Sequence, residues 1–339
     1  MNHTAFFEQV KKGNIQPVYL MEGTEEYIKQ QAVRQLCAKL LPAGLEELNL
    51  TDLTDPEADA LIAAAETLPF MADRRIVIIR ECSLLTAGKK AENEDKAAQI
   101  AEYVERIPPT ACVVFFVKGK ADGRKKLYTL LKKKNAIVEF SPMSDAECAD
   151  WARRTMARMG KQMSPRTADK LVFTVGRDAA LLKQEMEKLA AYLADRPEVT
   201  EADIDAICTR STECTVFQMV DAQVAGRNDV AFGLLKDMVR AGEDRIGILA
   251  MLLRQYRILY HMRSLMDERA PQQSQASLLG IPPFAVSRTQ QQARRYDRAR
   301  LKEAYESLLD YEQQIKGGLT PQEGCAENAL LRLEAILRA

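Results

Sequence analysis

The stretch ETLPFMADRRIVIIR, from Glu66 to Arg80, joins two segments of different character. Its second half contains Ile76–Ile79, a short run of β-branched apolar residues that predicts a strand buried on both faces of a sheet. Its first half, Leu68-Pro69-Phe70-Met71, places large apolar side chains after a predicted helix over 56–66. Because Pro69 disfavours helical dihedrals at the residue before it, we expect these side chains to lie on a turn.

Two interpretations of this turn stay open on the residues alone. In the first, Leu68, Phe70 and Met71 pack against the core and hold the turn in place. In the second, they form an exposed hydrophobic plug that docks into a pocket on a partner.

Strand-like and helix-like segments alternate over residues 17–140. Strands are predicted at 17–21, 45–50, 76–80, 112–117 and 136–140, and helices at 25–41, 56–66, 92–106 and 124–134. Five strands with helices between them predict a parallel sheet covered on both faces. Since Ser141-Pro142 ends the last strand, this α/β domain is expected over residues 1–141.

The rest of the chain has a helical pattern, so the predicted fold class is α/β plus all-α. A small helical domain is expected over 142–210, and a second helical domain over 211–339. In the latter, one helical stripe combines Ile246, Leu249, Leu253, Tyr256 and Tyr260. Loops are predicted at 271–277 and 281–283, and amphipathic helices at 299–315 and 326–338, the first ending at a pair of glycines.

The composition is that of an ordinary globular protein without a dominant charge. Hydrophobic residues make up 47% of the 339 residues, and 48 Lys and Arg balance 48 Asp and Glu. The whole chain therefore has no field that attracts nucleic acid, and any basic surface must be local. The longest apolar runs are far too short to span a bilayer, so we expect no membrane contact.

The N-terminal residues and the cysteines favour the cytoplasm. The segment MNHTAFFEQVKKGN has no signal-peptide shape. The seven cysteines are scattered without a C-x-x-C pair, and only two histidines accompany them. A disulfide framework or a metal site is therefore not expected, which fits a reducing compartment.

The turn after the first strand is where a sheet of this kind binds nucleotide phosphates. A P-loop, G-x-x-x-x-G-K-[ST], surrounds phosphates with backbone N–H groups and meets their charge with its lysine. Here the turn reads MEGTEEYIK from Met21 to Lys29, with one glycine and no Gly-Lys pair. Glu25 and Glu26 add charge that repels a polyphosphate. We expect no cofactor and find no catalytic arrangement of side chains.

A basic run over 118–134 contains eight Lys or Arg and one Asp. One interpretation is a solvated helix with Leu127, Leu130 and Leu131 facing the sheet. The other is contact with a phosphate backbone or a neighbouring subunit. The candidate contact residues are Arg124, Lys125, Lys126, Lys132, Lys133 and, near the C-terminus, Lys316.

Taken together, these features resemble the delta subunit of bacterial DNA polymerase III, part of the clamp loader that opens the sliding-clamp ring. The resemblance covers nearly all of the chain, and the order and spacing of its segments are specific. It is carried by PVYLMEGTEEYIKQQ, LPFMADRRIVIIRE, VVFFVKGKADGRKKLYTLLKK, GRDAALLKQEMEKLAAY, TVFQMVDA, IGILAMLLRQYRILY and IKGG.

The resemblance implies an architecture for each part of the chain. Residues 1–141 would be an AAA+-like domain with a degenerate P-loop, 142–210 a small helical lid domain, and 211–339 a helical collar domain for oligomerisation. The missing Gly-Lys pair fits a decayed nucleotide site. Ala179 also fits, because active relatives carry a second arginine at that position of the Gly176-Arg177-Asp178 segment.

The resemblance also implies which residues bind the clamp. The family's clamp-binding element, a hydrophobic pair before the third strand, maps onto Phe70-Met71, with Leu68 and Pro69 beside it. The family often has Leu-Phe there, so Phe-Met keeps the bulk and changes the individual contacts.

The implied function is that of a subunit that binds the sliding clamp (beta) and opens its ring during replication, without ATPase activity of its own. Its implied partners are the clamp, the ATPase and delta-prime subunits of the loader, and primed DNA through the assembly, all within the DNA polymerase III holoenzyme. Two alternatives are an AAA+ ATPase with an unconventional phosphate loop and a nucleic-acid-binding adaptor.

Overall fold

The first part of the chain folds around a five-stranded parallel sheet. In a computed structural model, which describes residues 1–86 and 94–338, the chain divides into two compact units, Met1–Pro142 and Met143–Ala339. The sheet lies in the first unit, and its neighbouring strands all run parallel in the order β2-β3-β4-β1-β5. In that order the strands are Leu50–Thr54, Arg75–Arg80, Ala111–Phe116, Val18–Glu22 and Ile137–Glu139. The predicted parallel sheet is confirmed.

Apolar residues on both faces explain why β3 and β4 occupy the middle of the sheet. Ile78 pairs with Val114, and both side chains are buried. One face of the sheet packs against α4 (Ala58–Glu66), α5 (Glu94–Glu105) and α6 (Lys126–Lys133) in a single hydrophobic cluster. Each large apolar side chain in such a cluster contributes about 1.5–3 kcal/mol by leaving water.

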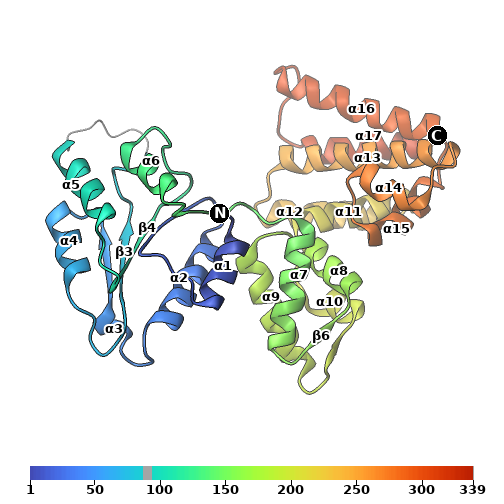
Figure 1. The fold of residues 1–339 in the computed structure, drawn as a ribbon. Coiled ribbons are helices and arrows are strands. Elements are labelled where there is room, and N and C mark those ends of the chain that lie inside the picture. The colour runs from blue at the N-terminus through green and yellow to red at the C-terminus, as the bar shows by residue number, and fades with distance from the viewer. Residues whose placement is uncertain (87–93, 339) are drawn as a thin grey trace. The chain divides into compact units, whose positions relative to one another are not determined.

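The other face of the sheet is covered by α1 (His3–Lys12) and α2 (Glu26–Leu40), as Figure 1 shows. Phe6 of α1 is fully buried, and its ring lies 5.2 Å from that of Tyr19 and 6.4 Å from that of Phe140. Edge-to-face contacts of this kind add to the hydrophobic gain of burying the rings. Helices therefore cover both faces, as the pattern of the central strands requires.

The strand predicted at 45–50 is wrong for most of its length. Glu46–Asn49 forms α3, a helix of 4 residues, and β2 starts only at Leu50. Glutamates at 46 and 47 occupy the first turn of α3, where the helix dipole favours negative charge. As an edge strand, β2 is only half buried, so its apolar pattern is weak. Of the helix predicted at 92–106, residues 92–93 lie outside the described residues.

The second unit is largely helical, in agreement with the predicted pattern. Ser144 starts it with a capping box, in which its hydroxyl accepts from the Glu147 N–H and the Glu147 carboxylate accepts from the Ser144 N–H. Its helices are α7 (Asp145–Arg158), α8 (Pro165–Val175), α9 (Ala179–Leu193), α10 (Glu201–Ile207), α11 (Thr212–Val224), α12 (Asn228–Arg240), α13 (Arg245–Asp267), α14 (Gln272–Leu279), α15 (Pro283–Ala293), α16 (Arg298–Lys316) and α17 (Cys325–Arg338). No helix formed by the described residues is both long and apolar enough to cross a membrane.

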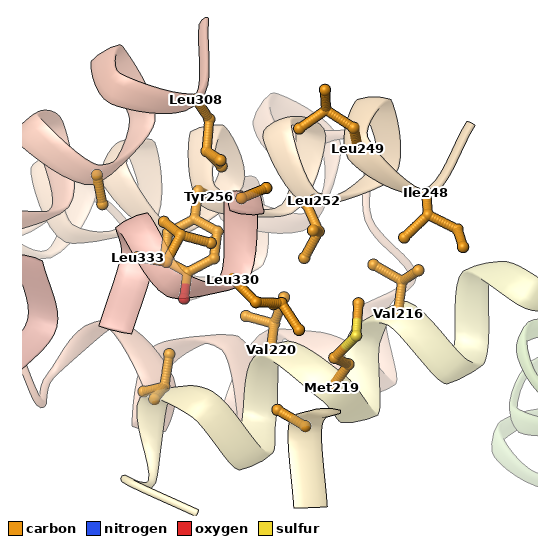
Figure 2. Close-up of a cluster of buried hydrophobic side chains, with 14 of the residues drawn as sticks. Val216, Met219, Val220, Ile248, Leu249, Leu252, Tyr256, Leu308, Leu330 and Leu333 are labelled. Atoms are coloured by element: carbon orange, nitrogen blue, oxygen red, sulfur yellow. The ribbon is translucent and has the colours of Figure 1, made fainter. Parts of the chain in front are cut away.

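A large hydrophobic cluster holds the helices of the C-terminal part together. Figure 2 shows side chains of α11, α13, α16 and α17 meeting in it, and Val220, Tyr256, Leu308, Leu330 and Leu333 are among its buried members. These elements are far apart in sequence, so the cluster ties residues after 300 to residues near 216. The finer division of the unit at Arg210 stays a prediction.

Three details of the second unit differ from the sequence prediction. The loop predicted at 271–277 is mostly α14, because Pro271 stands just before the helix, where its missing N–H costs no hydrogen bond. Pro283, also expected in a loop, is the first residue of α15 for the same reason. Two short parallel strands, β6 (Gln162–Met163) and β7 (Glu198–Val199), were not predicted, since 2-residue strands carry no periodic signal.

Candidate functional site

Three large apolar side chains are exposed on the apolar turn, Leu68–Met71, between α4 and β3. Leu68 is 77% exposed, Phe70 is 54% exposed and Met71 is 75% exposed. The interpretation in which these side chains pack against the core is therefore wrong. The interpretation of the turn as an exposed plug is the one that the geometry allows.

Such a concentration of exposed apolar groups is unusual on a protein surface. Other exposed large apolar residues among those described, such as Leu181 and Tyr192, stand apart from one another in sequence. Single exposed apolar residues are normal, whereas clustered ones mark sites of interaction. The apolar turn is the best candidate for a binding surface in the first unit.

The backbone of the apolar turn is held by buried polar side chains. Asn49, at the end of α3, accepts from the Phe70 N–H at 2.7 Å and donates to the Phe70 carbonyl at 3.0 Å. Arg75, the first residue of β3, donates to the Thr67 carbonyl at 3.2 Å. Met71 adopts φ +50°, a left-handed conformation that few residues other than glycine adopt. The exposed side chains are thus carried by a fixed backbone.

Neither of the polar side chains that hold the turn was a candidate in the sequence. Asn49 fell in a segment predicted as a strand, and Arg75 lay just before the strand predicted at 76–80. Asn49 is fully buried and Arg75 nearly so. Burial lowers the pKa of Arg75 below its usual value. A buried asparagine next to a helix end indicates that its side chain bonds to backbone groups. Recognising this from the sequence requires knowing where α3 ends.

The turn after β1, where a P-loop would surround phosphates, is closed by hydrogen bonds to the segments that follow β4 and β5. The Gly23 N–H donates to the Gly119 carbonyl at 2.7 Å, and the Glu25 N–H donates to the Phe140 carbonyl at 3.2 Å. A Cβ at Gly23 would lie 2.2 Å from the Phe140 carbonyl oxygen, and its φ is +117°. Backbone groups that bind phosphate in a P-loop are therefore occupied by other backbone groups.

The charged side chains around this turn also oppose phosphate binding. Lys29 is fully buried, and its ammonium donates to the Val117 carbonyl at 2.7 Å and to Glu26 at 2.6 Å. Glu22, at the end of β1, is buried and accepts from the Ala121 N–H at 2.8 Å. The lysine charge is thus already compensated by Glu26, and a second carboxylate, that of Glu22, lies at the end of the strand that leads into the turn.

The basic run forms the exposed surface of α6 and the loop before it. Leu127 and Leu131 face the core, whereas Lys126, Lys132 and Lys133 are exposed. The other members of the run are partly paired: Arg124 with Asp122 at 2.8 Å, Lys120 with Glu139 at 3.4 Å and Lys134 with Glu105 at 3.0 Å. The side-chain hydrogen bond from Arg124 lowers the pKa of Asp122 to about 2.

The remaining candidate contact residues are not brought into one site by the structure. Lys125 is the N-cap of α6 and is half-buried. Lys316 lies in the second unit, at the last position of α16, where it pairs with Glu312 at 3.0 Å. The exposed lysines of α6 therefore form the only part of the predicted contact set that gathers on one described helix.

A cavity of about 410 Å³ opens in the second unit between α8, α10, α11 and α15. Its floor contains Phe173, Phe217 and Phe284, whose rings meet edge to face. Four of its charged residues form ion pairs with one another, Arg166 with Glu201 at 2.7 Å and Lys170 with Asp205 at 2.8 Å.

The chemistry of this cavity does not indicate catalysis. Burial raises the pKa of Cys214, which lines it, to about 11, so the thiol is protonated at neutral pH and is a weak nucleophile. In the described parts of the chain, no three His, Cys, Asp or Glu side chains are grouped so that they could hold a metal ion.

The fold and the site define a class: a domain with a five-stranded parallel sheet, in which the turn after β1 is closed by hydrogen bonds, followed by a largely helical part. Residues 19–141 match the family model described as "DNA polymerase III, delta subunit". Residues 213–333 match the model described as "DNA polymerase III delta subunit, C-terminal domain". Together the two matches cover more than two thirds of the chain. The chain belongs to the DNA polymerase III delta subunit family.

Individual relatives agree with this assignment. The chain is 29% identical over 331 residues to DNA polymerase III subunit delta of Bacillus subtilis (strain 168). The aligned residues cover 96% of this chain and 95% of the relative. The solved structure of the Bacillus subtilis DNA clamp loader delta protein (YqeN) aligns with 99% of this chain and 100% of its own, at 27% identity and a TM-score of 0.56. The fold class predicted from the sequence is confirmed by the sheet and by this match.

A weaker likeness is found with the Thermotoga maritima RuvB Holliday junction branch migration motor. That structure covers 86% of this chain and 83% of its own, at 13% identity and a TM-score of 0.38.

Proposed function

We propose that this chain binds the sliding clamp through the apolar turn, Leu68–Met71, and opens the clamp ring for loading on DNA or removal from it. The observation that carries the proposal is the exposure of Leu68, Phe70 and Met71 together on a turn with a fixed backbone. Membership of the delta subunit family supports it, because a solved relative, 27% identical, is described as a DNA clamp loader delta protein.

The energetics of the apolar turn suit a protein interface. Each of its large side chains contributes about 1.5–3 kcal/mol when it leaves water. Part of this gain is offset by the loss of translational and rotational freedom and by ordering of side chains at the interface. Because the backbone of the turn is already held by Asn49 and Arg75, the remaining ordering cost falls mainly on the side chains.

Binding alone does not open a ring. A ligand shifts a conformational equilibrium only by the difference between its affinities for the two states. To turn a clamp that is open in about one molecule in a hundred into one that is open in about half, the subunit must bind the open form about a hundredfold more tightly, or by about 2.7 kcal/mol. The apolar turn supplies the attachment, and the fit of the surrounding surface supplies the preference.

In this proposal the chain takes no energy from nucleotide itself. The closed phosphate turn leaves ATP hydrolysis to the ATPase subunits of the loader, which would expose or cover the apolar turn. The helices from α11 onward would form a collar with those subunits and with delta-prime. A chain ending at Arg210 should then bind the clamp and fail to enter the loader, and its co-elution with the ATPase subunits in gel filtration would contradict the collar assignment.

The exposed lysines of α6 support a second contact, with primed DNA or with a neighbouring subunit. Lys126, Lys132 and Lys133 are unburied and lie on one short helix. Contact with phosphates would make the affinity fall steeply with salt concentration. Lys132→Glu with Lys133→Glu should weaken DNA binding by the assembled loader and reduce its salt dependence. If only assembly is weakened, the surface contacts a subunit.

The decisive experiment measures binding of the full chain to the sliding clamp without nucleotide. Phe70→Ala with Met71→Ala should lower the affinity by about 2 kcal/mol or more, as truncation of an interface hot spot does. Leu181→Ala, which truncates an exposed leucine on α9, is the matched control and should bind like the wild type. Equal affinity of the double variant and the wild type would refute the proposal.

A further inference from the structure

The side-chain amide of Asn49 contacts both polar groups of one residue of the apolar turn. Its Oδ1 accepts from the Phe70 N–H at 2.7 Å, and its Nδ2 donates to the Phe70 carbonyl at 3.0 Å. The second Nδ2 hydrogen is directed to the Leu45 carbonyl at 3.0 Å. The amide thereby bonds to both backbone polar groups of Phe70, as a neighbouring strand would, although Asn49 belongs to α3.

The chemistry of these partners fixes the orientation of the amide. Exchanging its oxygen and nitrogen would place an acceptor against the carbonyls of Leu45 and Phe70, and a donor against the Phe70 N–H. The observed orientation is therefore the only one that satisfies all three contacts. Because the side chain is fully buried, water cannot replace a lost contact without opening the turn.

A second anchor stands at the other end of the turn. Arg75 donates through Nη1 to the Thr67 carbonyl at 3.2 Å and through Nη2 to the Thr51 hydroxyl at 2.9 Å. Thr51 belongs to β2 and Arg75 to β3, so this anchor is built on the sheet. The backbone is thus held just before Leu68 and again at Phe70, while the side chains of the turn stay in solvent.

Exposed apolar side chains on an unsupported turn would be expected to fold back onto the protein. The two anchors oppose this, and they also hold the chain that leads to the left-handed Met71. A turn fixed before it meets a partner loses less conformational entropy on binding, which raises affinity without any new contact. A buried polar side chain whose hydrogen bonds to the turn all go to backbone groups is well placed for this role.

We propose that Asn49 is a positioning residue that holds the apolar turn in the conformation that binds the clamp. The inference rests on the proposed function, since it requires the apolar turn to be the binding surface. Asn49 itself is fully buried and need not touch the partner. Its effect on clamp affinity is transmitted through the backbone of Phe70.

Two substitutions of Asn49 separate its donor and acceptor roles in the full chain. Asn49→Asp keeps the size of the side chain and the acceptor for the Phe70 N–H, but it sets a carboxylate oxygen against the carbonyls of Leu45 and Phe70. Asn49→Ala removes all three hydrogen bonds. We expect both variants to bind the clamp about tenfold more weakly or worse, a loss of about 1.4 kcal/mol. Ile79→Val, which removes one buried methyl group from β3, is the control for destabilisation and should bind normally.

A second readout follows the turn in the absence of the clamp. Hydrogen exchange of the Phe70 amide should become at least about tenfold faster in Asn49→Ala, because its acceptor is gone, while the amides of β4 keep their protection. In Asn49→Asp the acceptor is retained, and this amide should stay protected. An unchanged exchange rate of the Phe70 amide in Asn49→Ala would overturn the inference whatever the clamp does.

A double-mutant comparison distinguishes this inference from the proposed function. If Asn49 acts through the apolar turn, Asn49→Ala should have no further effect on clamp affinity when Phe70 and Met71 are already alanine. If Phe70→Ala with Met71→Ala weakens binding but Asn49→Ala does not, the positioning role is wrong and the proposed function stands. If neither weakens binding, the proposed function fails first.

Discussion

The hydroxyl of Tyr256 donates a hydrogen bond of 2.9 Å to the side-chain oxygen of Gln223, in the middle of the hydrophobic cluster of the second unit. Gln223 in turn donates to the Leu330 carbonyl at 2.9 Å. Burial raises the pKa of Tyr256 well above its usual value, so the hydroxyl keeps its proton at any physiological pH. One polar chain therefore links α11, α13 and α17 inside an otherwise apolar cluster.

Tyr256→Phe should lower the free energy of unfolding of the second unit. The substitution leaves the buried Gln223 oxygen without its donor, which costs about 1–3 kcal/mol. Urea denaturation followed by circular dichroism measures the effect. Tyr192→Phe, on the exposed face of α9, is the control and should change stability by less than about 0.5 kcal/mol. A Tyr256→Phe variant as stable as the wild type would show that water or Gln223 itself compensates.

The isolated chain should neither bind nor hydrolyse ATP with magnesium. The N–H groups of Gly23 and Glu25 are already bonded to backbone carbonyls, and Lys29 is buried against Glu26. Titration calorimetry with ATP should therefore give no binding heat. A dissociation constant in the micromolar range would contradict this prediction and favour the alternative of an unconventional nucleotide site.

The wild-type chain, without nucleotide, should release clamps from closed circular DNA. In the proposed function it carries the preference for the open ring itself, so no ATPase subunit is needed for unloading. Phe70→Ala with Met71→Ala should abolish release, because it removes about 2 kcal/mol or more of clamp affinity. The assay follows labelled clamp on a circular plasmid.

The same double variant should melt like the wild type, since both side chains are exposed. Surface substitutions of this kind change stability by less than about 0.5 kcal/mol. A double variant that melts normally and still unloads clamps would end the proposal for the apolar turn.

The stability of the first unit should depend on pH through Asp55. Burial raises the pKa of this carboxyl, but the hydrogen bonds from Ser83 and the charge of Lys96 outweigh burial and hold the pKa below 3.8. The carboxylate accepts from the Ser83 N–H at 2.9 Å and from its hydroxyl at 2.8 Å. A group with a lowered folded-state pKa stabilises the fold above its unfolded pKa, and that contribution is lost as the pH falls through the folded pKa.

Asp55→Asn should therefore lower the unfolding free energy by about 1 kcal/mol at neutral pH. It should also flatten the fall in stability below about pH 4. Asparagine tolerates the left-handed φ of +42° at this position, so the backbone is preserved. Urea unfolding at neutral and at acidic pH makes the comparison, with Asp59→Asn on α4 as the control. Parallel pH profiles for wild type and Asp55→Asn would refute the role of Asp55.

The sequence predicts the sheet well because its signal is strong where burial is complete. Ile76–Ile79 and the segment at 112–117 are apolar on both faces, and the structure places them as central strands β3 and β4. The edge strand β2 is half-exposed, so its residues lack a continuous apolar run, and the prediction at 45–50 missed α3. The sequence pattern of a segment predicts its secondary structure only when the whole segment lies in the same environment.

The helical stripe of α13 shows a different limit. The sequence selects Ile246, Leu249, Leu253, Tyr256 and Tyr260, whereas the fully buried set includes Leu249, Leu252, Tyr256 and Leu259. This helix packs against α11, α15, α16 and α17, so more than one face is buried and a single stripe cannot describe it. The contacts that decide the burial come from residues far away in the sequence.

The candidate binding residues were predictable, but the residues that support them were not. Leu68, Phe70 and Met71 are conspicuous as large apolar groups beside Pro69. Whether they bind the clamp stays a prediction, as does the role of the lysines of α6. Asn49 and Arg75 act through backbone atoms of the turn. No local sequence pattern predicts a contact between residues 21 positions apart, such as Asn49 and Phe70.

The turn after β1, from Met21 to Lys29, is closed by backbone hydrogen bonds, and this limits how the chain could change. Its hydrogen bond between Gly23 and Gly119 joins two main-chain groups, and so does the bond from Glu25 to Phe140. Exchanging side chains leaves such bonds in place, so inserting a Gly-Lys pair into this turn would not recreate a nucleotide site. The loops after β4 and β5 would have to move away first. The course of the backbone, and not only the identity of the side chains, thus separates this turn from a P-loop, and single substitutions would not convert one into the other.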